Sequence, residues 1–260
     1  MLPFIKIAGR PYPMYGIMGV IGFLSGLLYL SVRLRKNRKD FEDAIYIYTL
    51  SVVGAMAGAK LLYIVTVLPQ FASDFPLISA NPMLFARKYL SGGMVMYGGL
   101  LGGLLTACLV SRYFGRHLSE FVAILLPPLI LLAAFGRIGC FCAGCCYGKE
   151  TAASIGVIYP PQAIAPSGVR LLPVQLFEAC FDFILFILFA VLGQKPQPKP
   201  YLLALYIALY SAFRFVIEFF RGDLARGIWF GLSTSQWIAA GAMIISIGYF
   251  IHRTAQLLKD

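Results

Sequence analysis

Long apolar stretches separated by short polar or charged segments dominate the chain. The hydrocarbon core of a bilayer is about 30 Å thick, so a helix that crosses it needs about 20 apolar residues. Seven stretches of the 260-residue chain are close to that length. They predict seven transmembrane helices, at Met14–Val32, Ala44–Leu68, Gly92–Ser111, Ser119–Gly136, Val174–Gly193, Tyr201–Phe219 and Ser233–His252.

Composition supports this interpretation and excludes a soluble protein. Charged residues make up 13% of the chain and hydrophobic residues 60%, whereas soluble domains are about 25% charged. We therefore expect an all-α polytopic membrane protein with a single transmembrane domain over residues 1–260. The segment Gly139–Pro173 is long enough for a small loop or head region, and it contains a β-like run at Ile155–Tyr159.

The positive charges predict the orientation of the chain. One alternate set of loops holds 11 Lys and Arg among 33 residues, and the other holds 8 among 84. Cytoplasmic loops carry the excess of Lys and Arg, so we expect a periplasmic N-terminus and a cytoplasmic C-terminus. The basic run Arg33–Lys39 has no interleaved aromatic residues. It therefore indicates contact with membrane lipids and no nucleic acid.

Charged residues within the spans are costly and commonly functional. Arg214 and Glu218 are spaced to share one helix face, and Arg221 follows just beyond them. Guanidiniums that converge near the outer headgroup level form a fork-shaped site suited to phosphate. A buried network in which the charges neutralise one another is the alternative. The residues concerned, within or at the ends of spans, are Lys60, Arg137, Glu178, Asp182, Arg214 and Glu218.

Two further groups leave alternatives open. Gly98 and Gly99 follow Tyr97 in a glycine-rich span, which favours close helix packing or the approach of a lipid. Four cysteines lie within seven residues, which is compatible with a metal site or with a disulfide. The four are Cys140, Cys142, Cys145 and Cys146, and the disulfide would join Cys142 to Cys145 or Cys146.

Motifs along most of the chain resemble those of the prolipoprotein diacylglyceryl transferase family. Gly136-Arg137-Ile138-Gly139-Cys140-Phe141 is similar to the family signature that begins Gly-Arg-x-Gly-Asn-Phe. The other matching segments, in order along the chain, are Tyr15-Gly16, Gly54–Lys60, Gly92–Gly99, Pro173–Glu178, Tyr210–Arg221 and Gly231–Gln236.

The resemblance implies an enzyme of the bacterial inner membrane. It would move diacylglyceryl from phosphatidylglycerol to the lipobox cysteine of a prolipoprotein signal peptide, release glycerol phosphate, and need no cofactor or metal. The phosphate would be held by two arginines that stabilise its developing charge. The catalytic residues so implied are Arg137, Arg214, Tyr97 and Glu218. The phosphatidylglycerol-binding residues are Arg137, Arg214, Tyr15, Gly98, Gly99, Glu178, Gln175, Tyr210 and Arg221.

The chain departs from the family pattern at four positions. Tyr97 stands where the family has His, and Lys60 stands where it has Arg. Within the signature, this chain has Cys140 where the family has Asn and Cys145 where the family has Glu. Tyr97, with an ordinary pKa near 10, is open to a role as base or as hydrogen-bonding group. The roles of Cys140, Cys145 and Lys60 stay open. The alternatives are a related protein whose cysteines do thiol or redox work, and a lipid or solute transporter.

Overall fold

The computed structural model describes residues 3–7, 9–35, 38–90, 93–194, 199–223 and 227–257. Helices dominate these residues, as expected for an all-α polytopic membrane protein. Within the described part of the chain, six helices are long and apolar enough to cross a membrane. They are Met14–Arg33, Asp40–Thr66, Leu118–Ala143, Val174–Leu192, Tyr201–Phe220 and Thr234–His252.

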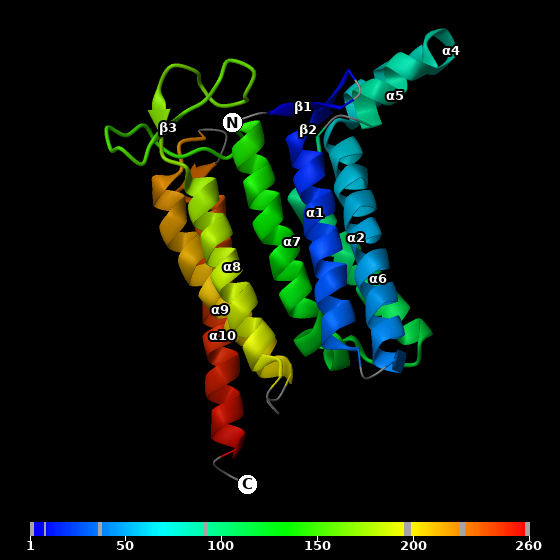
Figure 1. Ribbon diagram of the computed structural model, residues 1–260, viewed down its shortest axis with the longest axis vertical. Helices are drawn as coiled ribbons and strands as arrows, with labels where there is room; N and C mark the ends of the chain where they lie inside the picture. Colours follow the sequence, from blue (N-terminus) through cyan, green and yellow to red (C-terminus); the bar gives the residue numbers. More distant parts are fainter. Residues whose placement is uncertain are drawn as a thin grey trace. The chain divides into compact units, whose positions relative to one another are not determined.

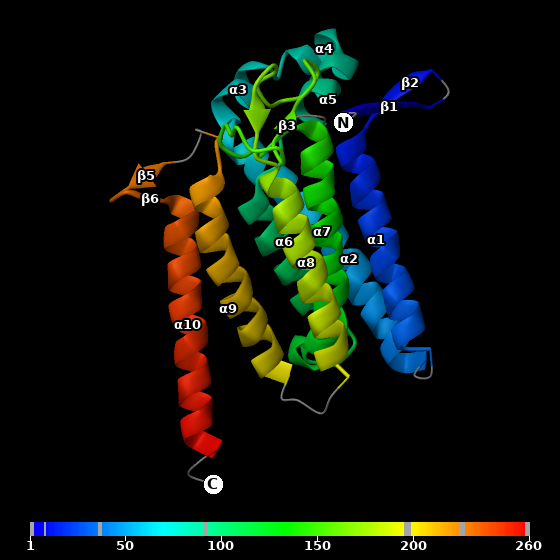
Figure 2. The same cartoon turned by 60° about the vertical axis from the view of Figure 1, so that its left-hand side comes forward.

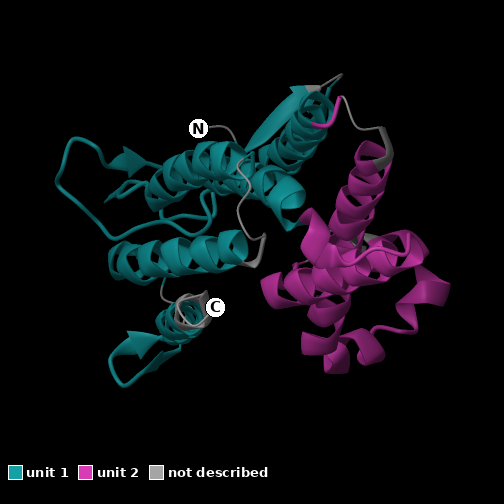
Figure 3. Ribbon diagram, turned by 90° about the horizontal axis from the view of Figure 1, so that it is seen from below, with its two compact units in different colours: residues 1–33, 122–260 teal, residues 34–121 magenta. Residues whose placement is uncertain are grey.

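The chain folds into two compact units (Figure 3). Unit 1 combines residues 1–33 with residues 122–260, and unit 2 comprises residues 34–121. Five long helices form the body of unit 1: α1 (Met14–Arg33), α7 (Val122–Ala143), α8 (Val174–Leu192), α9 (Lys199–Ile217) and α10 (Thr234–Leu257). Its shorter elements are β1 (Phe4–Ile7), β2 (Arg10–Pro13), β3 (Val157–Ile158), β4 (Arg170–Leu171), η2 (Glu218–Phe220), β5 (Ile228–Trp229) and β6 (Leu232–Ser233).

Within unit 1 the helices run alternately up and down. The start of α1, α8 and α10 and the end of α7 and α9 lie at the same end of the unit (Figures 1 and 2). A core cluster of Leu126, Ile130, Leu185, Phe189 and Leu202 joins α7, α8 and α9. This arrangement gathers the charged helix ends of α7, α8 and α9 at one end of unit 1.

Glycine allows α1 to pack closely on α7. A Cβ atom added to Gly22 would lie 2.8 Å from Cβ of Phe135, and one added to Gly139 would lie 3.1 Å from Cδ2 of Tyr15. A larger side chain at either position would separate the helices. The second contact keeps Tyr15 beside the end of α7.

The segment between α7 and α8 forms a compact loop with its own small core. Tyr159, Ala165 and Leu171 are its buried centre, and β3 pairs with β4 in antiparallel fashion, so part of the expected β-like run does form a strand. Main-chain hydrogen bonds tie this loop to the end of α9. The amide of Lys149 donates to Phe220 O at 2.9 Å, and the amide of Gly222 donates to Tyr147 O at 3.0 Å. This pairing holds the loop against the residues that follow η2.

Unit 2 is built on two long helices in close contact. A Cβ added to Gly98 would lie 2.3 Å from Gly58 O, and one added to Gly102 would lie 2.4 Å from Gly54 O. The glycines are therefore required for the packing of α6 on α2. The elements of unit 2 are α2 (Arg38–Thr66), α3 (Leu68–Ser73), α4 (Leu77–Ala80), α5 (Pro82–Leu90), α6 (Met96–Tyr113) and η1 (Leu118–Phe121).

Several helix boundaries differ from those predicted, and two of the differences concern α7 and α6. Helix α7 continues to Ala143, beyond the expected end at Gly136, because Arg137 is paired within the protein and does not have to reach water. Helix α6 spans 18 residues and corresponds to the third predicted span, whose first residue, Gly92, lies outside the described residues. Glycines and a terminal arginine make α6 less apolar than the six helices named above.

Candidate functional site

Glu178, in the first turns of α8, lies between three arginines. Its Oε1 accepts a hydrogen bond from Nη1 of Arg214 at 2.8 Å and lies 3.7 Å from Nη1 of Arg221. Its Oε2 lies 3.4 Å from Nη1 of Arg137. Glu218 then joins the group, since its Oε2 lies 2.8 Å from Nη2 of Arg214. Five of the predicted site residues, from α7, α8, α9 and the segment after α9, thus form one connected ion-pair network.

The open side of this network presents guanidinium groups. The side chains of Arg137 and Arg214 keep 18% and 13% of their surface exposed, whereas those of Glu178 and Glu218 keep 4% each. The carboxylates therefore lie behind the arginines. An anion that approaches the exposed part of the network therefore meets guanidinium groups, which are common phosphate ligands in proteins.

Arg221 is the most deeply buried of the three arginines. Its Nε and Nη2 donate to Oδ1 and Oδ2 of Asp223 at 3.0 and 2.9 Å, and 3% of its side chain is exposed. Its Nη1 makes no hydrogen bond within the described part of the chain. The sequence did not identify Asp223, because a carboxylate in a polar loop is ordinary and the spacing Arg-x-Asp was the only signal.

Ser233 connects the network to the start of α10. Its hydroxyl donates to Oε1 of Glu218 at 2.9 Å and accepts a hydrogen bond from the amide of Gln236 at 3.2 Å. Oε1 of Gln236 accepts in turn from the amide of Ser233 at 2.9 Å. These two reciprocal bonds form a capping box. The motif that contains Ser233 and Gln236 was noticed in the sequence without a role, and the structure supplies one.

Two tyrosines predicted to bind the lipid lie near Arg137. The hydroxyl of Tyr210 is within hydrogen-bonding range of the Arg137 guanidinium. Tyr15 is half-exposed and packs beside Gly139, two residues after Arg137. Tyr15 also lies close enough to Arg137 for the two to interact electrostatically. Both tyrosines thus lie near this arginine, and their contact with a lipid stays a prediction.

Gln175, also predicted to bind the lipid, is fully buried. Its Nε2 donates to the main-chain oxygen of Cys145 at 2.7 Å, and its Oε1 accepts from the hydroxyl of Tyr159 at 3.3 Å. Burial raises the pKa of Tyr159 to about 12, so this phenol remains a donor at neutral pH. In this structure Gln175 supports the loop that follows α7.

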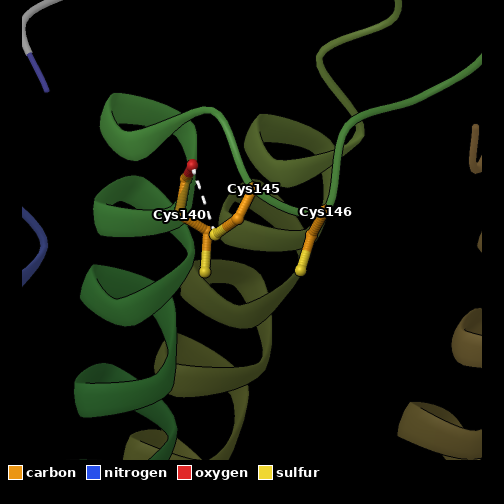
Figure 4. A group of neighbouring side chains, drawn as sticks. All are labelled: Cys140, Cys145 and Cys146. Carbon is orange, nitrogen blue, oxygen red and sulfur yellow. Dashed lines mark hydrogen bonds between the residues drawn. The ribbon is translucent and has the colours of Figure 1, made fainter. Parts of the chain in front are cut away.

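Three of the four clustered cysteines bring their sulfur atoms together (Figure 4). The Sγ atoms of Cys140, Cys145 and Cys146 all lie within 4.8 Å of one another, and this group is suited to hold a metal ion. All six cysteines of the chain are free thiols, so the expected disulfide of Cys142 with Cys145 or Cys146 is absent. The reason is geometric, since Cys142 lies two residues along α7 from Cys140 and residues so spaced face different ways.

Cys146 differs from an ordinary thiol. Hydrogen bonds from the Cys140 and Cys145 thiols, together with the positive charge of Arg221, lower the pKa of Cys146. Since Arg221 belongs to the ion-pair network, the three thiols lie directly beside that network.

The remaining predicted residues lie in unit 2. Tyr97 is 43% exposed in the first turn of α6, and Gly98 and Gly99 pack against α2. Nζ of Lys60 donates to the main-chain oxygens of Tyr89 and Gly93, each at 3.1 Å. Lys60 therefore fastens the connection between α5 and α6. Packing accounts for glycine at positions 98 and 99, and lipid binding by these residues stays a prediction.

Comparison with known proteins gives consistent matches over nearly the whole chain. The family model "Prolipoprotein diacylglyceryl transferase" matches residues 4–252. The phosphatidylglycerol–prolipoprotein diacylglyceryl transferase 2 of Clostridium perfringens is 37% identical over 240 residues, which cover 92% of this chain and 90% of that protein. The transferase of Clostridium tetani is 34% identical, with 91% of each chain covered. That of Oleidesulfovibrio alaskensis is 32% identical, with 89% of this chain and 84% of that protein covered.

Proposed function

Because the chain belongs to the prolipoprotein diacylglyceryl transferase family, we propose that it transfers diacylglyceryl from phosphatidylglycerol to the cysteine of prolipoproteins. This is the first step of lipoprotein maturation. The protein is a transferase and a multi-pass protein of the bacterial plasma membrane. Its substrates are phosphatidylglycerol and a prolipoprotein that carries a lipobox cysteine.

The observation that carries this proposal for the site is the arrangement of Arg137 and Arg214. Both guanidiniums keep exposed surface while the carboxylate of Glu178 is buried behind them. Oε2 of Glu178 has no hydrogen-bond donor within the described residues, and its 3.4 Å contact with Arg137 is long for a charge-assisted hydrogen bond. Arg137 therefore retains donors for a phosphate ligand.

The reaction replaces a carbon–oxygen bond by a carbon–sulfur bond. The acceptor sulfur attacks the glyceryl carbon that carries the phosphate, a thioether forms, and the electron pair of the broken bond leaves with glycerol phosphate. The thiol proton ends on the leaving phosphate. Negative charge grows on phosphate oxygens as the bond breaks, so Arg137 and Arg214 act by stabilising that charge. Glu178 and Glu218 hold the two guanidiniums in place.

Other site residues have supporting parts in this proposal. Tyr15 and Tyr210, which lie near Arg137, contact the lipid, and Arg221 contributes positive charge from behind. Tyr97 contributes a hydroxyl in its exposed position. Gly98 and Gly99 act through the close packing of α6 on α2, and Gln175 acts by supporting the loop after α7.

The proposal includes the membrane topology. Helix α6, apolar over most of its 18 residues, crosses the membrane as a seventh span. The N-terminus and the loop between α7 and α8 lie on the periplasmic face, and the C-terminus lies in the cytoplasm. The unequal distribution of Lys and Arg between the loops supports this orientation.

The test is transfer of labelled diacylglyceryl from phosphatidylglycerol to a lipobox peptide by the purified protein in detergent. Removing one preorganised donor to a developing oxyanion costs about 10²–10³-fold in rate. We expect losses of that size in Arg137→Ala and Arg214→Ala. Arg170→Ala, at an exposed position of the loop, is the control and should keep the wild-type rate. Transfer at the wild-type rate by both site variants would refute the proposed site.

A further inference from the structure

The three thiols described above come from two consecutive pieces of chain. Cys140 lies in the last turn of α7, and Cys145 and Cys146 follow in the loop. Figure 4 shows the three side chains directed to a common region from the helix and from the loop. All three are half-buried, so each keeps some exposed surface.

The main chain is shaped to bring these thiols together. Gly144 ends α7 with φ +77°, and its amide donates to Cys140 O at 2.9 Å. Cys146 has φ 58°, a left-handed conformation that is strained for an L-residue. Gln175 fixes the loop between these two residues by its hydrogen bond to Cys145 O at 2.7 Å. The strained conformation is what allows two adjacent cysteines to face the same point.

The spacing of the sulfur atoms fits a thiophilic cation. A tetrahedral zinc ion with Zn–S bonds of about 2.3 Å holds its sulfur ligands about 3.8 Å apart. The three Sγ atoms already lie within 4.8 Å of one another, so small rotations of the side chains suffice. Soft thiolate ligands select such ions over Mg²⁺ or Ca²⁺.

Charge also favours such an ion. Three thiolates and one Zn²⁺ carry a net charge of −1, and the Arg221 guanidinium beside Cys146 offsets it. Zinc prefers four ligands, and sites with three protein ligands leave the fourth position to water or substrate. The fourth position here would lie next to the end of α7 that carries Arg137.

We propose that Cys140, Cys145 and Cys146 bind a Zn²⁺ ion whose fourth position takes the acceptor cysteine thiol. This inference rests on the proposed transferase function. Coordination removes the thiol proton to water, the bound sulfur forms the carbon–sulfur bond as the carbon–oxygen bond to phosphate breaks, and the leaving phosphate takes up a proton. Zinc keeps its oxidation state, and the neutral thioether, a weaker ligand than a thiolate, dissociates.

The expected gain follows from the state of the acceptor. A free cysteine with a pKa near 8.5 is about 3% thiolate at pH 7, whereas a metal-bound thiol is deprotonated outright. Coordination therefore raises the reactive fraction about 30-fold. A histidine in the ion-pair network could serve as an alternative base for the acceptor thiol. The chain has two histidines, and neither lies in the described network: His117 lies in unit 2, and His252 lies far along α10 from Ser233.

The first experiment measures metal binding alone. Wild-type protein is purified in detergent, stripped with a chelator, and titrated with Zn²⁺ and, separately, with Co²⁺. We expect about one ion per chain and a thiolate-to-cobalt charge-transfer band. The triple variant Cys140→Ser, Cys145→Ser, Cys146→Ser should lose both, and the matched variant Cys108→Ser, Cys142→Ser, Cys180→Ser should keep both. Absence of stoichiometric binding by the wild type, or a disulfide among the three cysteines, would overturn the proposal whether or not the triple variant folds.

The second experiment links the ion to the acceptor. A lipobox peptide should change the cobalt spectrum, and the same peptide with its cysteine replaced by Ala should not. Chelation should lower transfer about 30-fold and added Zn²⁺ should restore it. Full transfer by metal-free protein would sink the zinc proposal and leave the transferase intact. Zinc binding with no transfer under any condition would instead remove the transferase function on which the role of the ion depends.

Discussion

Replacing Glu178 by Gln removes one negative charge from the centre of the ion-pair network and changes little in shape. The carboxylate lies 2.8, 3.4 and 3.7 Å from guanidinium nitrogens of Arg214, Arg137 and Arg221, and 4% of its side chain is exposed. Breaking a buried ion pair by removing one partner costs about 3–5 kcal/mol, because the charge that remains has no compensation. We expect a loss of that size in the free energy of unfolding.

Activity should fall for a related reason. Without this carboxylate Arg137 loses its ion pair with Glu178 and Arg214 keeps its ion pair with Glu218. A misplacement of the guanidiniums by about 1 Å can cost about 10²-fold in rate. The assay is the initial rate of diacylglyceryl transfer in detergent, with thermal unfolding of the same samples. Glu150→Gln, the same change at an exposed position of the loop, should leave both unchanged. Wild-type rate and stability in Glu178→Gln would show that Glu178 does not hold the arginines.

Three more outcomes test neighbouring features. Gly98→Ala should destabilise the protein by about 1–3 kcal/mol, because the new Cβ would lie 2.3 Å from the main-chain oxygen of Gly58. Gly241→Ala is the control and should not destabilise it, because a Cβ there would have no neighbouring atom within 4 Å. Equal thermal midpoints for the two variants would contradict this prediction. Ser233→Ala should lower the free energy of unfolding by about 1–3 kcal/mol, because it removes the 2.9 Å hydrogen bond to Oε1 of Glu218 and the cap of α10. Thermal unfolding measures this loss, and an unchanged midpoint would contradict the prediction. In chelator-treated protein that lacks the cysteines outside the group of three, the reaction of Cys146 with iodoacetamide should slow less from pH 8 to pH 6 than that of an ordinary thiol, because the pKa of Cys146 is lowered. An ordinary thiol would slow about 75-fold over that range, and equal slowing of Cys146 would show that its pKa is not lowered.

The sequence predicted the helices of unit 1 well because hydropathy decides them. It also identified the ionisable residues of the network, since charge within an apolar helix is conspicuous. Arg137, Glu178 and Arg214 were found in this way. Burial was not predictable, because the exposed fractions of Arg137 and Arg221 depend on how the loop after α7 folds. The sequence contains no direct signal for that packing.

Two residues show the limit of pattern analysis more sharply. Lys60 stood out as a charge within a span, but its ammonium group satisfies the main-chain oxygens of Tyr89 and Gly93, a contact between segments about 30 residues apart. The grouping of the three thiols depends on the left-handed conformations of Gly144 and Cys146. A non-glycine residue rarely adopts such a conformation, so spacing alone favoured a different pairing.

The loop after α7 is joined to the segment after α9 by main-chain hydrogen bonds, from Lys149 to Phe220 and from Gly222 to Tyr147. Every amino acid other than proline supplies these groups. The connection therefore depends on main-chain groups and on two glycines, since a Cβ at Gly148 would lie 2.5 Å from Leu172 O and one at Gly222 would lie 2.4 Å from Gly148 O. Mutation can therefore exchange the chemical groups at the tip of the loop while the guanidinium of Arg221 stays in position. This separation of framework from reactive groups makes the end of unit 1 that carries the ion-pair network a place where new chemistry can evolve without a new fold.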